Sequence, residues 1–126
     1  MTGPSAPAVE TEGLTKFYGL IRGLEDMDLR VERGEIFGFL GPNGAGKTTT
    51  VRLLLGFLHP TRGRARLLGL DVESSAMEIR RRVGYLPAEM GFYDGLTGQA
   101  YLDYMARFKG KDVRPRQRSL VEALEL

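Results

Sequence analysis

The sequence predicts an α/β fold that forms one domain or part of one. Strand-like and helix-like patterns alternate along the chain, which is typical of α/β proteins. An almost unbroken apolar run at residues 36–40 has the character of a strand buried on both faces, and glycines follow it immediately. The length of 126 residues is close to the usual size of a single domain.

The composition excludes several classes of site. The chain has no cysteine, which rules out a disulfide scaffold, a thiolate zinc site and a catalytic cysteine, and its one histidine, His59, rules out a multi-histidine metal cluster. The net charge of +2 is too small for a nucleic-acid-sized basic surface, so we expect no nucleic-acid partner. The alternating Arg62, Arg64 and Arg66 are instead expected to form a solvated face.

The N-terminal residues 1–8 are rich in proline, alanine and small polar residues, which predicts a flexible leader before a domain at residues 9–126. No part of this leader has the basic region and apolar stretch of a secretory signal. The longest apolar stretch, residues 51–58, is too short to span a bilayer. We therefore expect a cytoplasmic protein.

Partial alternation of apolar and polar residues predicts two further strands, at residues 8–14 and 24–31, before the buried one. From about Gly46 the apolar residues follow helical spacing, which predicts a helix that the pair His59 and Pro60 closes.

The second half of the sequence predicts shorter elements. We expect a strand at residues 64–68, a small helix at 75–82, a strand at 83–86, a helix that begins at Thr97 and a last helix at 115–126. The apolar face of the helix after Thr97 is formed by Tyr101, Tyr104, Met105 and Phe108.

The chemistry of the chain is concentrated at residues 41–49, which match G-x-x-x-x-G-K-[ST] between the buried strand and a helix. In such a loop the glycines let backbone N–H groups approach phosphate oxygens, and the helix N-terminus points at the same place. Lys47 adds a positive charge for the β- and γ-phosphates, Thr48 a hydroxyl for Mg²⁺, and Thr49 a hydroxyl for the α-phosphate. The predicted nucleotide-binding residues of the loop are Gly41, Pro42, Asn43, Gly44, Ala45, Gly46, Lys47, Thr48 and Thr49.

Several kinds of nucleoside triphosphatase share this loop. A GTPase needs an Asn-Lys-x-Asp motif for its base, but Asn43 is the only asparagine and lies in the loop itself. A small-molecule kinase is harder to reject, because its acceptor site has no short motif.

Residues 34–49 closely resemble the Walker A region of ATP-binding cassette (ABC) transporter ATPase subunits. Residues 14–19 are similar to the aromatic loop of that family, and further similar stretches, at 60–63, 69–71, 83–87 and 93–97, match the strand and turn after the Walker A helix and the surroundings of the glutamine loop, especially in multidrug and antibiotic exporters. The resemblance implies a P-loop core with an N-terminal antiparallel β subdomain, ATP and Mg²⁺ as cofactors, and Tyr18 stacked on adenine. The alternative is that Phe17 or Tyr18 only packs within a strand.

The sequence departs from the family pattern on the γ-phosphate side. Where the family usually has glutamine after the Tyr-Leu-Pro segment, this chain has Ala88 followed by Glu89. The Glu89 carboxylate could replace the glutamine as a Mg²⁺ ligand. An ordinary solvated carboxylate is an equally good interpretation.

The family's signature motif, Walker B strand and switch histidine are not in these 126 residues. The apolar run that ends at Asp71 is more typical of a turn than of Walker B, and His59 is more typical of a solvated helix end than of a switch histidine. We therefore expect about the first half of an ATP-binding domain, which alone binds ATP weakly and hydrolyses almost none.

Three functions fit these observations. The first is the ATP-binding subunit of an ABC exporter, which works as a dimer with a second such subunit and with a membrane-spanning permease at the inner face of the membrane. The second is an ABC ATPase that acts on ribosomes or DNA. The third is a non-catalytic remnant.

Overall fold

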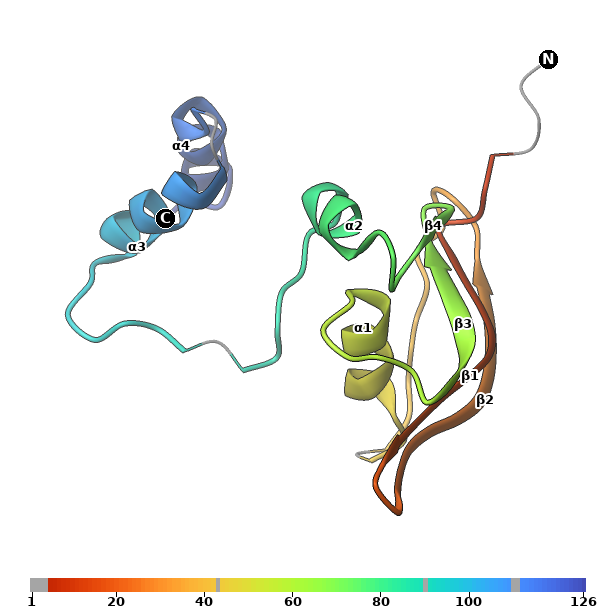
Figure 1. Ribbon diagram of the computed structural model, residues 1–126. Helices are drawn as coiled ribbons and strands as arrows, with labels where there is room; N and C mark the ends of the chain where they lie inside the picture. Colours follow the sequence, from red (N-terminus) through yellow and green to blue (C-terminus); the bar gives the residue numbers. More distant parts are fainter. Residues whose placement is uncertain (1–4, 43, 90, 110–111) are drawn as a thin grey trace. The chain divides into compact units, whose positions relative to one another are not determined.

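A four-stranded antiparallel sheet forms the frame of the first half of the chain (Figure 1). Its strands are β1 (Val9–Tyr18), β2 (Ile21–Val31), β3 (Arg62–Leu67) and β4 (Leu70–Asp71), in the order β2-β1-β3-β4. The antiparallel strands predicted before the Walker A loop are confirmed, and both are longer than expected. Strand β1 occupies the centre because β2 pairs along one of its edges and β3 along the other.

The computed structural model describes residues 5–42, 44–89, 91–109 and 112–126. The chain divides into two compact units, Met1–Tyr85 and Leu86–Leu126, and each is described by itself. The first unit contains the sheet and the Walker A loop. The second contains the two C-terminal helices.

Two helices of the first unit, α1 (Lys47–Leu54) and α2 (Ala76–Arg82), contribute to the same hydrophobic core as the sheet. The buried members of this core come from β1, β2, α1, β3, the turn after β4, and α2: Leu14, Leu24, Leu53, Ala65, Leu67, Val72 and Ile79. Each fully buried leucine or isoleucine side chain contributes about 1.5–3 kcal/mol relative to an exposed one. The core therefore holds α1, which begins directly after the loop, against the sheet.

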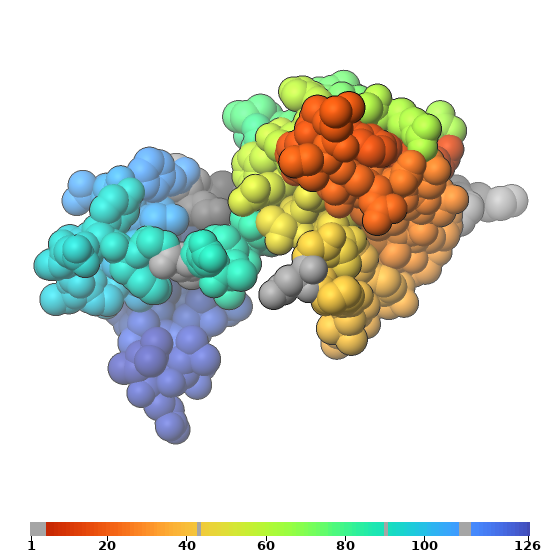
Figure 2. All heavy atoms as spheres, turned by 90° about the horizontal axis from the view of Figure 1, so that it is seen from below, coloured from red at the N-terminus to blue at the C-terminus, as the bar shows by residue number. Residues whose placement is uncertain are grey.

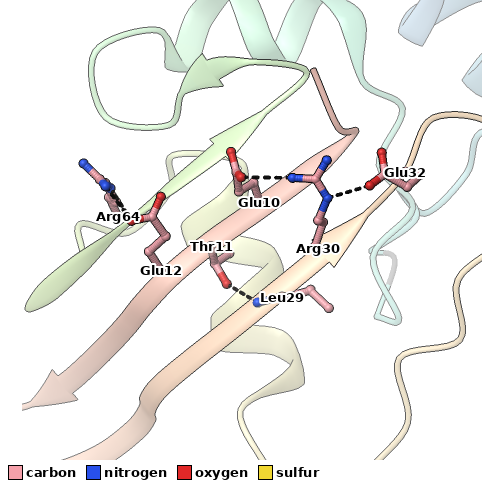
Figure 3. Close-up of polar contacts among 7 residues, drawn as sticks. All are labelled: Glu10, Thr11, Glu12, Leu29, Arg30, Glu32 and Arg64. Atoms are coloured by element: carbon pink, nitrogen blue, oxygen red, sulfur yellow. Dashed lines mark hydrogen bonds and ion pairs between the residues drawn. The ribbon is translucent and has the colours of Figure 1, made fainter. Parts of the chain in front are cut away.

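Charged side chains form ion pairs across the strands (Figure 3). Arg30 of β2 lies between Glu10 of β1, at 3.3 Å, and Glu32. Arg64 of β3 pairs with Glu12 of β1. These side chains are substantially exposed, so each pair contributes little to stability, but the arginines of β3 form the solvated face that the sequence predicts.

Residues 36–40 do not form the predicted buried strand. The segment has no strand pairing, and Ile36 and Leu40 are almost fully exposed. The Phe37 and Phe39 rings are 6.4 Å apart, as expected for alternate residues of an extended chain. A strand forms only where a neighbour accepts and donates its hydrogen bonds, and in the described part of the chain no strand lies beside this one. The strand predicted at 83–86 is absent for the same reason.

Helix α1 ends at Leu54, earlier than the predicted end at His59. The helix ends in a hydrogen-bonded cap in which the Gly56 N–H donates to the Leu53 carbonyl and the Phe57 N–H to the Arg52 carbonyl. Gly56 has φ +70°, a left-handed conformation that glycine adopts without strain. The apolar spacing continues past this glycine, so the spacing alone predicts a helix that is too long.

The second unit consists of α3 (Gly98–Ala106), a 3₁₀ turn (Arg107–Lys109) and α4 (Arg114–Ala123). The predicted start of α3 is confirmed, since the Thr97 hydroxyl oxygen accepts a hydrogen bond from the Ala100 N–H at 3.2 Å. None of the four side chains predicted on the apolar face of this helix is buried, and the last of them, Phe108, lies in the 3₁₀ turn. Tyr104 makes edge-to-face contacts with Tyr93 and Phe108, and Phe108 is 70% exposed.

An exposed carboxylate near the start of α4 gives a pH-dependent prediction. Hydrogen bonds and charge from Arg114 lower the pKa of Asp112 from 3.8 to about 2. A carboxylate with a lowered pKa favours the folded state at neutral pH, and this contribution is lost as the pH falls from about 4 towards 2. In an NMR titration we expect Asp112 to titrate near pH 2 in the native chain and closer to 3.8 in Arg114→Ala. An unchanged midpoint in the variant would contradict this assignment.

Candidate nucleotide-binding site

The loop before α1 is shaped by glycines with positive φ. Gly44 has φ +85° and Gly46, the N-cap of α1, has φ +94°. Within the loop the Ala45 N–H donates to the Pro42 carbonyl at 3.1 Å. A Cβ atom on Gly46 would lie 2.7 Å from the Gly23 carbonyl oxygen, so the loop approaches the β2 backbone as closely as only glycine allows.

Helix α1 has a side-chain hydrogen bond at each end. At its start the buried Thr50 hydroxyl donates to the Gly46 carbonyl at 2.7 Å. At its end the Arg80 guanidinium of α2 donates to the Leu55 carbonyl at 2.9 Å. The N-terminal N–H groups of a helix have no partner within the helix itself, so those of α1 face the loop and are available to an anion. The bond to Arg80 of α2 and the core contacts of α1 hold these N–H donors in place beside the loop.

A cavity of about 410 Å³ lies between the loop and the β1–β2 hairpin, a volume suited to a small-molecule ligand. In Figure 2 the yellow atoms of the loop meet the orange-red atoms of the hairpin at the surface of this unit. The lining residues are Tyr18, Ile21, Arg22, Gly23, Pro42, Gly44, Gly46, Lys47, Thr48 and Thr49.

The structure thus brings Tyr18 to the same cavity as six of the predicted loop residues. Of the others, Gly41 and Ala45 are not part of the lining, although the Gly41 carbonyl accepts a hydrogen bond from Lys47. Asn43 lies outside the described residues. The lining residues of β2 were not predicted from the sequence, although Gly23 stands out as a glycine within a strand.

The Tyr18 ring lies at the edge of the cavity and is 43% exposed. Its hydroxyl is 3.2 Å from the Thr49 hydroxyl of α1, and the Lys16 ammonium lies 5.6 Å from the ring centroid. A Cβ atom on Gly23 would come within 2.6 Å of ring atom Cε2, so the ring lies against the β2 backbone. In this position Tyr18 borders the cavity, and stacking on adenine stays a prediction.

The Lys47 ammonium is bonded to its own loop. It donates to the Gly41 carbonyl and, at 3.0 Å, to the Pro42 carbonyl. Both acceptors are neutral, so a phosphate oxygen, which carries charge, makes a stronger hydrogen bond to the same ammonium. A polyphosphate in the cavity can therefore replace the two carbonyls as the hydrogen-bond acceptor of the Lys47 ammonium.

The residues of this site fit a magnesium ion that arrives bound to the phosphates of a nucleotide and needs few ligands from the protein. In the described residues no cluster of three or more His, Cys, Asp or Glu side chains could hold a metal. Mg²⁺ keeps most of its waters and binds substrate phosphates with few protein ligands, so the exposed Thr48 hydroxyl at the cavity fits as one such ligand.

Glu89, the predicted substitute for the glutamine-loop side chain, is exposed at a bend in the second unit. Its role as a Mg²⁺ ligand stays a prediction.

Asp71 ends the short strand β4, and its carboxylate accepts hydrogen bonds from the Ser74 and Glu73 N–H groups at 3.0 Å. The Ser74 N–H is the main cause of the lowered pKa of Asp71. The predicted turn in this segment is confirmed. His59 is likewise exposed, as expected.

Comparison with known proteins identifies the family. A family model described as ABC transporter matches residues 24–124. This chain therefore belongs to the ABC transporter family.

Among curated proteins, the daunorubicin/doxorubicin resistance ATP-binding protein DrrA of Streptomyces peucetius is 42% identical over 113 residues, which cover 89% of this chain and 34% of DrrA. The bacitracin transport ATP-binding protein BcrA of Bacillus licheniformis is 41% identical over 102 residues, which cover 81% of this chain and 33% of BcrA. The predicted resemblance to drug and antibiotic transport proteins is thus confirmed. The chain spans about a third of the length of these relatives.

A solved structure of the ATP-binding subunit of an ABC transporter aligns with a TM-score of 0.72 and 31% identity, over 88% of this chain and 46% of that structure. The predicted α/β fold of an ABC cassette is confirmed by this alignment. None of the helices in the described part of the chain has the length and apolar character needed to cross a bilayer.

Proposed function

We propose that this chain supplies the Walker A half of the Mg-ATP site in the ATP-binding subunit of an ABC transporter that exports a drug or antibiotic. The observation that carries the proposal is the single cavity in which the Tyr18 ring, the Lys47 ammonium and the Thr48 hydroxyl come together. In this assignment Tyr18 stacks on adenine, the loop N–H groups and Lys47 bind the β- and γ-phosphates, Thr49 binds the α-phosphate and Thr48 holds Mg²⁺.

The names of the two relatives support transport over a role on ribosomes or DNA, because one name refers to drug resistance and the other to bacitracin transport. We infer that the subunit works at the inner face of the membrane, bound to a permease, and that two ATP-binding subunits close over the nucleotide. Hydrolysis also requires groups that activate water and stabilise charge on the γ-phosphoryl, and the cavity described here supplies only binding groups.

The role of Tyr18 tests the proposal. Stacking of a base on an aromatic ring contributes about 1–3 kcal/mol, so Tyr18→Ala is expected to weaken Mg-ATP binding by about 5- to 150-fold. Tyr18→Phe keeps the ring and serves as the matched control. Binding is measured by NMR chemical-shift titration, which detects weak affinities, with inorganic tripolyphosphate as a ligand that has no base. Equal Mg-ATP affinity in the alanine variant and the native chain would refute the assignment of Tyr18 to adenine, and an unchanged affinity in Lys47→Ala as well would refute the proposed function.

A further inference from the structure

The C-terminal end of β1 changes neighbours just before Tyr18. Pairing between β1 and β3 runs from Val9, opposite Leu67, to Thr15, opposite Arg62, and stops there. Pairing with β2 continues on the other edge to Phe17 and Tyr18. On the β3 side, the last residues of β1 therefore need other partners.

Those partners come from the segment of residues 59–61, which precedes β3. The Thr61 N–H donates to the Thr15 carbonyl at 2.8 Å, and the Thr61 hydroxyl accepts a hydrogen bond from the Phe17 N–H at 2.9 Å. In addition, the Lys16 ammonium donates to the His59 carbonyl at 2.7 Å. The Thr61 side chain thus takes the place that a strand carbonyl would have beside Phe17.

These bonds fix the backbone next to the aromatic ring. Phe17 lies opposite Arg22 of β2 on one edge, and its N–H donates to the Thr61 hydroxyl on the other. The next residue is Tyr18, whose ring direction follows from the backbone at its Cα atom. Thr61 itself is not among the residues that line the cavity, whereas Tyr18, next to its partner Phe17, is.

We propose that Thr61 is a positioning residue for nucleotide binding, whose hydroxyl holds the end of β1 so that the Tyr18 ring lies along the cavity. The inference rests on the proposed function, because it assumes that the ring stacks on the base. The same threonine joins the two walls of the site. Residues 55–61 connect the end of α1, which begins at the phosphate-binding loop, to β3, and Thr61 bonds to the strand that carries the ring.

The test compares Thr61→Val, which keeps the shape but removes the acceptor, with Thr61→Ser, which restores it. A hydrogen bond of this kind is worth about threefold to tenfold in an equilibrium, so we expect the valine variant to bind Mg-ATP that much more weakly and the serine variant to bind normally. Magnesium tripolyphosphate, which has no base, should bind all three proteins within about twofold. If the valine variant does not fold, Thr61→Ala, which removes the hydroxyl and adds no atoms, is expected to show the same loss of Mg-ATP affinity.

A double variant separates positioning from general damage. In a Tyr18→Ala background the Thr61→Val change should have no further effect on Mg-ATP affinity, because there is no ring left to position. Equal loss for both ligands, or a loss that persists without the ring, would overturn the inference alone. If Lys47→Ala and Tyr18→Ala both leave Mg-ATP binding unchanged, the proposed function fails and this inference fails with it.

Discussion

Lys47→Ala is expected to remove most of the affinity of the chain for Mg-ATP and for magnesium tripolyphosphate alike. The ammonium lies at the cavity, bonded to the Gly41 carbonyl and 3.0 Å from the Pro42 carbonyl oxygen, where phosphate oxygens are proposed to replace these acceptors. Hydrogen bonds to charged groups contribute about 1.5–3 kcal/mol, which corresponds to a loss of at least about tenfold in the dissociation constant. Chemical-shift titration with each ligand measures it.

The same helix offers a matched control for this experiment. Arg52 is an exposed cation of α1 that does not line the cavity, so Arg52→Ala removes the same formal charge without removing a proposed phosphate contact. It should change both affinities by less than about twofold, through screened long-range attraction only. Equal losses in the two variants would mean that net charge, and not the position of Lys47, determines binding.

Gly63→Ala is expected to destabilise the first unit more than an ordinary surface substitution. Gly63 has φ +79°, and a Cβ atom there would overlap the Gly13 carbonyl and lie 2.7 Å from the Glu12 carbonyl oxygen. Both contacts are with the β1 backbone, which cannot rotate away as a side chain does. We expect a loss of about 3 kcal/mol or more in the free energy of unfolding, measured by urea denaturation followed by circular dichroism.

Gly34→Ala isolates the conformational part of that loss. Gly34 has φ +77°, almost the same as Gly63, but a Cβ atom there meets nothing within 4 Å. An alanine in the left-handed region costs about 1–2 kcal/mol. If the two variants lose the same stability, the contact between β3 and β1 at Gly63 has no energetic weight.

Local signals in the sequence predicted much of the first unit. Alternation located β1 and β2, and the spacing of loop glycines with Lys47 located the start of α1. The exact end of α1 was missed, because apolar spacing continued past Gly56, whose left-handed cap ends the helix. The prediction of a strand at residues 36–40 was wrong for a different reason. Its composition fits a buried strand, but pairing depends on neighbours that composition does not specify.

The candidate site was predictable only as far as its residues lie in one motif. The Walker A pattern gave the loop, and family resemblance gave Tyr18, which β1 and β2 bring to that loop. Gly23 is recognisable as a glycine within a strand, but the sequence contained no local signal for its contacts with the loop and with Tyr18, or for the hydrogen bond from Phe17 to Thr61. These depend on contacts between segments far apart in the chain, which only the folded sheet establishes.

The bonds between Lys47 and the carbonyls of its own loop make ligand binding an exchange. Each new bond to a phosphate is gained only as one to a carbonyl is given up, so the heat released on binding is the difference between the stronger charged bond and the neutral one that it replaces. Calorimetry is therefore expected to record a smaller enthalpy for this lysine than an additional charged hydrogen bond would give. Nucleotide binding at Lys47 is therefore expected to exchange existing bonds, and not only to add new ones.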